Sequence, residues 1–182
     1  MLPILPTTAD YLVDIIRDQL DLANERVNVY NAKFNIPNDS HLFVAVEYKS
    51  TKVFASKSET SIDDNIFNEH QVLNVQEHYA IMIFSRNLEA LQRKEEIVMA
   101  LGSIYARQQA DTIGLKIARI APIQDLSYLE GAAILYRYEI PVVILRGYEK
   151  VPAVDWFGTF TGEVTAENGT DVTKDFTPTL PQ

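Results

Sequence analysis

Apolar residues near the start of the chain recur at intervals of three and four, which is the spacing of one face of an α-helix. Thr7 and Thr8 precede this run, and Asp10 stands three residues after Thr7, as in a capping box. We therefore expect a first helix from about Ala9 into residues 28–33. Its apolar positions are Leu12, Ile15, Ile16, Ala23 and Val27.

The period changes in the next part of the chain. From 42 to 49 the alternation predicts a strand whose second half is more polar. Residues 52–56 favour a second short strand paired with it, and residues 58–68 are polar enough for a loop. The strand pattern returns over 72–84, where residues 79–84 are apolar on both faces, as expected in the middle of a sheet.

A second helix of about five turns is expected after this strand. Ser85 or Asn87 can cap it, and Glu89 lies in the first turn, where the helix dipole favours a negative charge. One apolar stripe predicts the buried face of this helix. Its members are Leu91, Ile97, Val98, Leu101, Ile104 and Tyr105.

The last regular elements are two strands separated by a connection. Residues 115–120 predict a strand, residues 122–131 a turn-rich connection, and residues 132–145 a long strand. The even-numbered positions of the long strand are apolar and share one face, whereas Arg137 and Glu139 lie on the other.

Pro141 lies within this long strand and has no N–H to donate, so we expect a sheet edge or a bulge there. After Gly147 the periodicity fades, and we divide the chain into a domain over 1–147 and a C-terminal arm over 148–182. The order of helix, strands, helix and strands predicts an α+β fold. In it, a mainly antiparallel sheet packs against two helices as a two-layer sandwich.

Composition narrows the range of functions. The 182 residues carry 16 Lys and Arg against 25 Asp and Glu, and the net charge of −9 disfavours a protein that grips DNA phosphates. The absence of cysteine excludes disulfides, thiolate metal sites and cysteine nucleophiles. No apolar run approaches the roughly 20 residues of a membrane helix. Pro3 and Pro6 interrupt a start that lacks the basic region of a signal peptide, so we expect a soluble protein made in the cytoplasm.

Five acidic residues in the region of the first helix recur at three and four residues and are expected on one face. One interpretation of this pattern is a solvated helix face. The other is an acidic surface directed at a basic partner or at passing DNA. The five residues are Asp10, Asp14, Asp18, Asp21 and Glu25.

Catalytic motifs are sparse. Asp39 followed by Glu47-Tyr-Lys49 is similar to the metal-binding carboxylates and the lysine of PD-(D/E)xK nucleases, although Glu47 and Lys49 also fit the solvated face of an ordinary strand. Glycine-rich phosphate loops and a serine-hydrolase elbow are absent, and the three histidines lack metal-ligand spacing. We expect no enzyme, no metal and no cofactor, and we keep a metal-dependent nuclease as the alternative.

A strand that runs directly into a Glu- and Arg-rich helix, followed by a turn and a long closing strand, forms a pattern across most of the chain. Its segments are 77–86 (EHYAIMIFSR), 89–96 (EALQRKEE), 99–101, Ser103, 105–108 (YARQ), 125–127, Glu130-Gly131 and 135–138 (LYRY). Together, over about Thr8 to Arg146, they resemble the tail terminators of long-tailed bacteriophages, which complete the neck end of the tail.

The resemblance implies a structural virion protein, located in the tail and neck, whose α+β subunits form a ring on the tail tube, expected as a hexamer. Such a ring ends tail polymerisation and forms the joint to the head or neck connector. Its expected partners are further copies of itself, the tail tube protein, the connector proteins, and genome DNA that passes the lumen without specific binding. The five acidic residues are then candidates for the lumen or a partner face, because negative potential repels phosphates.

Candidates for contacts between copies are Trp156, Phe157, Phe160 and Arg137. The three aromatic residues can equally fold back on the chain's own core. A third function also stays open, an accessory binding domain of the head and tail region that forms no ring.

Overall fold

The computed structural model describes residues 7–30, 39–63, 66–130, 133–151, 160–165 and 171–176, the last two ranges by their backbone. The α+β class expected from the sequence is confirmed, with a mixed, mostly antiparallel seven-stranded sheet, and with three α-helices in the described chain instead of two. In chain order the elements are α1 (Thr8–Leu20), η1 (Asn24–Arg26), β1 (Val27–Val29), β2 (Phe43–Asp63), β3 (Ile66–Ser85), α2 (Glu89–Gly102), α3 (Ile104–Thr112), β4 (Leu115–Ile120), β5 (Gln124–Asp125), β6 (Tyr128–Glu130), β7 (Ala133–Lys150), β8 (Phe160–Thr165) and β9 (Asp171–Phe176).

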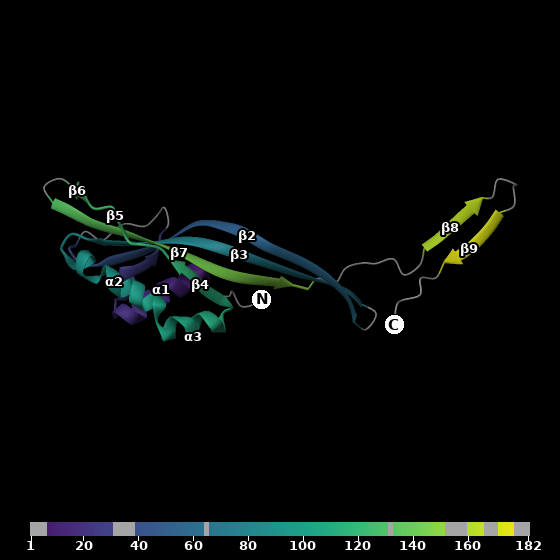
Figure 1. Cartoon of the computed structure of the whole chain (residues 1–182), viewed down its shortest axis with the longest axis horizontal. Coiled ribbons are helices and arrows are strands. Elements are labelled where there is room, and N and C mark those ends of the chain that lie inside the picture. The colour runs from purple at the N-terminus through teal and green to yellow at the C-terminus, as the bar shows by residue number, and fades with distance from the viewer. Residues whose placement is uncertain are drawn as a thin grey trace. The chain divides into compact units, whose positions relative to one another are not determined.

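The seven-stranded sheet has the order β1-β2-β3-β7-β4, and β5 and β6 also pair with β7. β1 runs parallel to β2, with Val27 opposite Val44, whereas β4, β5 and β6 run antiparallel to β7. The three helices lie on the same side of the sheet (Figure 1). This layering follows from the apolar face of each helix, which is buried only when it packs against the sheet or another helix.

Apolar side chains are buried on both sides of the sheet. The main core lies between sheet and helices, and Leu12, Ile97, Ile81 and Ile140 in it are all 0% exposed. A smaller cluster lies on the opposite side of the sheet, which explains why the middle of β3 is apolar at successive positions. This outer cluster consists of Phe43, Ala45, Met82 and Phe84.

α1 begins as predicted from the sequence. The Thr7 hydroxyl oxygen accepts a hydrogen bond of 3.2 Å from the Asp10 backbone N–H, and the Asp10 carboxylate accepts one of 2.9 Å from the Thr7 backbone. The helix ends at Leu20, earlier than predicted, because Asp21 is left-handed with a φ of 51°. Val27, which fits the helical period, belongs instead to β1 in the core, where its β-branched side chain suits an extended backbone.

Two sequence predictions for residues 52–68 are wrong. β2 continues without a break to Asp63, so residues 52–56 are not a separate strand, and the described part of 58–68 is strand instead of loop. The ladder between β2 and β3 depends on backbone N–H and C=O groups, which pair whether the side chains are polar or apolar. A strand that is held by backbone hydrogen bonds can therefore consist of Ser, Thr and Lys, for which the side-chain pattern predicts a loop.

The predicted second helix is two helices. Ser103 is extended, with φ −68° and ψ 159°, and its hydroxyl oxygen accepts a hydrogen bond of 3.0 Å from Ala106 N–H. It therefore ends α2 and caps α3. The break changes the phase of the buried face in α3, so Ile104 of the predicted stripe is 73% exposed, and Leu91, beside the buried Ala90 in α2, is 39% exposed. The residues buried instead are Ala90, Ile97, Ala100, Leu101, Ala106 and Ala110.

β7 lies inside the sheet between β3 and β4, so the sheet edge expected at Pro141 is not there. The Pro141 carbonyl accepts a hydrogen bond of 2.8 Å from Ala121 N–H, so this carbonyl points to the side of the strand on which β4 and β5 lie. The missing N–H faces the same side, because both groups of a strand residue point to one neighbour. Pairing with β4 stops at Val142 and pairing with β5 starts at Glu139, so the proline occupies the gap between two partner strands.

The chain divides into two compact units, Met1–Ser56 with Val72–Tyr148, and Lys57–Gln71 with Glu149–Gln182. In the second unit, β8 and β9 form an antiparallel hairpin with Phe160 opposite Phe176. Of the candidate interface residues, Trp156 and Phe157 lie outside the described residues. None of the described helices has the length and apolar character that crossing a membrane requires.

Candidate interaction surfaces

The acidic residues of the first helix region are all exposed, but they do not share one helix face. Asp10 is part of the N-terminal cap, and Arg17 lies 2.5 Å from Asp14 and 3.5 Å from Asp18. Tyr105 of α3 also donates a hydrogen bond of 3.0 Å to Asp18. Because α1 ends at Leu20, the two remaining acids are not on the helix. They are Asp21 and Glu25.

Arg137 lies on the outer side of β7, over the outer cluster. The centre of its guanidinium group is 5.3 Å from the centroid of the Phe84 ring, and Nη2 donates to the Met82 sulfur at 3.1 Å. Its Nε is buried and has no hydrogen-bond partner, and none of the described carboxylates forms an ion pair with it. A buried donor without a partner is unusual in a folded subunit. The expected role of Arg137 in a contact between copies stays a prediction, because the buried Nε itself is not accessible to another subunit.

The three residues of the nuclease alternative belong to two separate ion pairs. Asp39 accepts hydrogen bonds of 2.8 and 2.7 Å from Arg26, and Glu47 accepts one of 2.7 Å from Lys49. Among the described residues, no three His, Asp or Glu side chains come together as a metal site would require. Each carboxylate is thus compensated by a protein cation.

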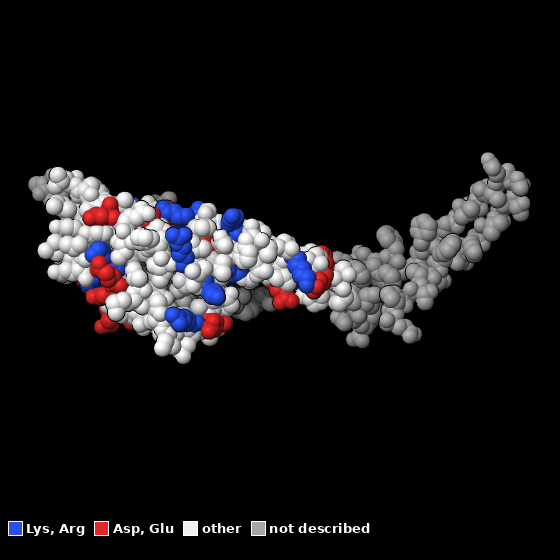
Figure 2. Space-filling view, in the orientation of Figure 1, with Lys and Arg blue, Asp and Glu red and all other residues white. Residues whose placement is uncertain are grey.

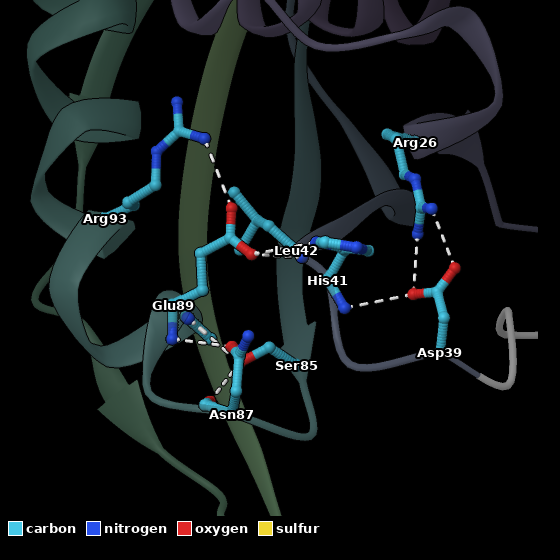
Figure 3. A network of polar contacts seen from close by, with 9 residues as sticks. Arg26, Asp39, His41, Leu42, Ser85, Asn87, Glu89 and Arg93 are labelled. Atoms are coloured by element: carbon cyan, nitrogen blue, oxygen red, sulfur yellow. Dashed lines mark hydrogen bonds and ion pairs between the residues drawn. The ribbon is translucent and has the colours of Figure 1, made fainter.

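The Asp39 carboxylate fixes the start of β2 (Figure 3). Besides Arg26, it accepts a hydrogen bond of 3.0 Å from the backbone N–H of His41. The hydrogen bonds from the Arg26 guanidinium, with that from His41, lower the pKa of Asp39 to about 2. Charge-assisted, two-pronged contacts of this kind hold both partners in one orientation.

Glu89 connects the start of β2 with the helices in the same network (Figure 3). Its carboxylate accepts a hydrogen bond of 2.9 Å from Leu42 N–H and lies 3.4 Å from Arg93, which also donates to the Leu20 carbonyl at 2.9 Å. The N-cap position of α2 is Leu88, so neither predicted cap residue occupies it, but the Ser85 and Asn87 side chains still accept hydrogen bonds of 2.9 and 2.8 Å from the first turn of α2. The network is structural, because its carboxylates and guanidinium groups are paired with one another or with the backbone.

Two regions of β2 differ in their surroundings. In the near half, residues 43–46, every side chain is at most 1% exposed. In the far half, residues 48–60, every residue is exposed, so both faces of the strand meet solvent. Its apolar members are also open, with Tyr48 at 52%, Val53 at 53% and Phe54 at 52%.

A buried carboxylate marks the boundary between these halves. Glu77 is 6% exposed and accepts hydrogen bonds of 3.3 Å from the Tyr79 hydroxyl and 3.0 Å from the Tyr148 hydroxyl. Burial, with the nearby Glu77 charge, raises the pKa of both phenols. The ring of Tyr48, at the start of the far half, meets Tyr79 edge-on with centroids 5.7 Å apart. The two tyrosine hydroxyls therefore give the buried Glu77 carboxylate its hydrogen-bond donors at this boundary.

A groove that the sequence analysis missed runs along β4. It has a volume of about 680 Å³ and is lined by all of Leu115–Ile120 and by residues of α2 and α3, among them Arg107 and Asp111. Lys and Arg atoms lie over this part of the molecule, with acidic atoms beside α3 (Figures 1 and 2). The sequence contains one indication of an irregular strand here. The spacing of the apolar positions 115, 117 and 120 changes from two to three, as at a β-bulge.

No protein-family model matches this chain, and no curated protein matches its sequence.

Proposed function

We propose that this chain is a structural subunit of the tail-terminator type. In this role copies form a ring on the last ring of a tail tube, end its polymerisation and present a surface to the head or neck connector. The observation that carries the proposal is the far half of β2, which is exposed on both faces over residues 48–60. A strand that its own core does not cover is a surface for other subunits.

A ring needs two different contact surfaces on each subunit, because each copy meets its neighbours head to tail. Large apolar side chains are exposed at separate places in the described chain. Met99 and Ile104, around the break between α2 and α3, are each 73% exposed, and Leu129 of β6 is 74% exposed. With Val53 and Phe54 of β2, these residues supply apolar anchors on different elements, which is what a closed head-to-tail assembly uses.

The charge of the chain also supports the proposal. A net charge of −9 and five exposed acids near α1 give a surface that repels phosphates. DNA that passes such a lumen would slide without specific binding. The resemblance of residues 8–146 to tail terminators supplies the type of ring and the expected partners, which are tail tube and connector proteins.

The test is the state of assembly. Light scattering coupled to size exclusion, with negative-stain microscopy of the main peak, would be carried out at several concentrations and salt levels, with and without tail tube protein. We expect a ring with an axial hole, formed by the subunit alone or on the end of a tube. A strict monomer under both conditions would overturn the proposal.

A further inference from the structure

The groove along β4 lies beside an unpaired sheet edge. β4 is the end of the strand order and pairs with β7 on one side, and no other described strand pairs with it. Its outer backbone groups are therefore available to a further strand, and the groove of about 680 Å³ gives room beside them.

A bulge gives this edge two chemically different faces. The register with β7 shifts between Ile117 and Arg119, so Ala118 is the extra residue. Ile117 and Ile120 then pair with core residues of β7 and pack against the main core on the helix side. Lys116 and Arg119, three apart in sequence, both fall on the opposite side of the sheet, because their partners on β7 are two residues apart, Leu145 and Val143.

The hairpin of β8 and β9 has the matching pair of faces. Because residues on a strand alternate between faces, the register places one set of cross-strand pairs on each side. One face carries Phe160 with Phe176, Val164 with Val172, and Gly162 with Lys174. The other face carries Thr161 with Asp175, Glu163 with Thr173, and Thr165 with Asp171.

The hairpin also lacks a partner of its own. Among the described strands, β8 and β9 pair with each other in a separate two-stranded sheet. An isolated two-stranded hairpin is marginally stable in water, and one with an apolar face needs a surface to cover that face. β4, β8 and β9 are each six residues long, so a strand of the hairpin matches the open edge in length.

We propose that β9 of one copy pairs with the open edge of β4 in a neighbouring copy, so that the sheet continues from subunit to subunit. In the extended sheet, the acidic face of the hairpin, with Asp171 and Asp175, lies on the side of Lys116 and Arg119. The apolar face of the hairpin covers the side of Ile117 and Ile120. The inference rests on the proposed ring, since an edge on one copy and a hairpin on the next are the two unlike surfaces that a head-to-tail contact requires.

The charges favour this arrangement on one side of the sheet. Asp171 and Asp175 of the hairpin meet Lys116 and Arg119 there. On the helix side the groove lining carries both Asp111 and Arg107, so Lys174 of the hairpin meets one charge of each sign. The opposite charges on the first side select this partner strand over others, and Lys116 and Arg119 discourage pairing between two β4 edges.

The chain contains no cysteine, so engineered cysteines report the contact directly. Two full-length variants, Ala118→Cys and Thr173→Cys, would be made separately, mixed at several concentrations and oxidised mildly. We expect a disulfide-linked dimer in the mixture that exceeds the dimer from either variant alone, and little from a control mixture of Gln92→Cys with Thr173→Cys, because Gln92 is exposed on α2 outside the groove lining and outside the far half of β2. The double variant Ala118→Cys/Thr173→Cys would distinguish docking within one chain, since an internal link without links between copies would overturn the proposal.

Charge reversal tests the faces. Lys116→Glu/Arg119→Glu, added to the Ala118→Cys copy, should lower the yield of the mixed dimer about tenfold, because two attractive pairs become repulsive. Asp171→Lys/Asp175→Lys in the other copy should restore it, and Lys150→Glu, outside both the groove lining and the far half of β2, should leave the yield unchanged. A yield that reversal does not lower would overturn the proposed orientation.

Negative-stain images of the same oxidised samples separate this inference from the proposed function. Rings without the mixed dimer would overturn the hairpin contact and leave the ring function standing. The absence of both rings and mixed dimers, with tail tube protein present, would overturn both.

Discussion

The near and far halves of β2 belong to one strand but are stabilised in different ways. Residues 43–46 are buried on both faces, between the main core and the outer cluster, and the start of the strand is tied down by Asp39 and Glu89. Residues 48–60 are exposed on both faces, and the side-chain contacts there are surface ones, such as the ion pair of Lys57 with Glu59. Hydrophobic burial therefore stabilises the first half, whereas the second half depends on its ladder with β3.

The difference separates what folding requires from what assembly can use. Removing apolar surface from water contributes about 25 cal/mol per Å², so the near half contributes to the stability of the subunit. Val53 and Phe54 of the far half are exposed to water in the single subunit. If another subunit covers them, burial of their apolar surface would contribute free energy to assembly instead.

Phe43→Ala should give the largest effect on the subunit itself. Phe43 is 1% exposed and belongs to the outer cluster with Phe84, whose ring centroid is 6.5 Å away. Truncating a buried phenylalanine loses its transfer free energy and leaves a cavity, so we expect the free energy of unfolding to fall by about 3–5 kcal/mol. Urea unfolding followed by circular dichroism measures it. A loss below about 1 kcal/mol would mean that the near half is not the anchored part of β2.

Glu77→Ala tests the boundary and should have an intermediate effect. The substitution leaves the hydroxyl of buried Tyr79, and that of the more exposed Tyr148, without their carboxylate acceptor. We expect a loss of about 2 kcal/mol in the free energy of unfolding. Glu47→Ala is the control, because its pair with Lys49 lies on the surface and should cost about 0.5 kcal/mol. Equal losses in both variants would contradict a structural role for the buried carboxylate.

Phe54→Ala is the matched counterpart of Phe43→Ala, with the same atoms removed from the same strand. Phe54 is 52% exposed, so the free energy of unfolding of the isolated subunit should change by no more than about 0.5 kcal/mol. In the proposed ring the same change should raise the protein concentration needed for assembly, measured by light scattering. A subunit destabilised as strongly as by Phe43→Ala would show that the far half is covered within a single copy.

Sequence patterns predicted the fold where side chains decide it. The alternation over 115–120 and 132–145 and the cap at Thr7 correspond to observed features, and the side chains of Ser85 and Asn87 bond to the first turn of α2 although Leu88 occupies its N-cap position. Patterns failed where backbone pairing or a single residue decides instead. The polar stretch after residue 50 is strand because β3 pairs with it, and Ser103 divides one apolar stripe into two helices.

The candidate surfaces were predictable to a smaller extent. The five acids are exposed as a polar pattern indicates, and Arg137 lies on the outer side of β7 as its odd-numbered position required. Its unpartnered Nε depends on Met82 and Phe84, which are more than 50 residues away in sequence, and no local pattern contains that information. The position of Lys116 and Arg119 on one side of β4 depends on a bulge, and the only trace of that bulge in the sequence is the altered spacing of the apolar residues.

The smallest predicted effect concerns acid stability at the anchored start of β2. The Arg26 hydrogen bonds lower the pKa of Asp39 from 3.8 to about 2, so the unfolded chain binds a proton at Asp39 before the folded chain does. The contribution of this group to stability is therefore complete above about pH 4 and is lost as the pH falls toward 2. Asp39→Asn should flatten the dependence of the melting temperature on pH across this window. Arg26→Gln should do the same, and combining the two should add nothing further, because both remove one interaction. If Asp39→Asn keeps the full acid dependence of the unsubstituted protein, the pair does not hold the near half of β2 in place, and the contrast with the far half depends on hydrophobic burial alone.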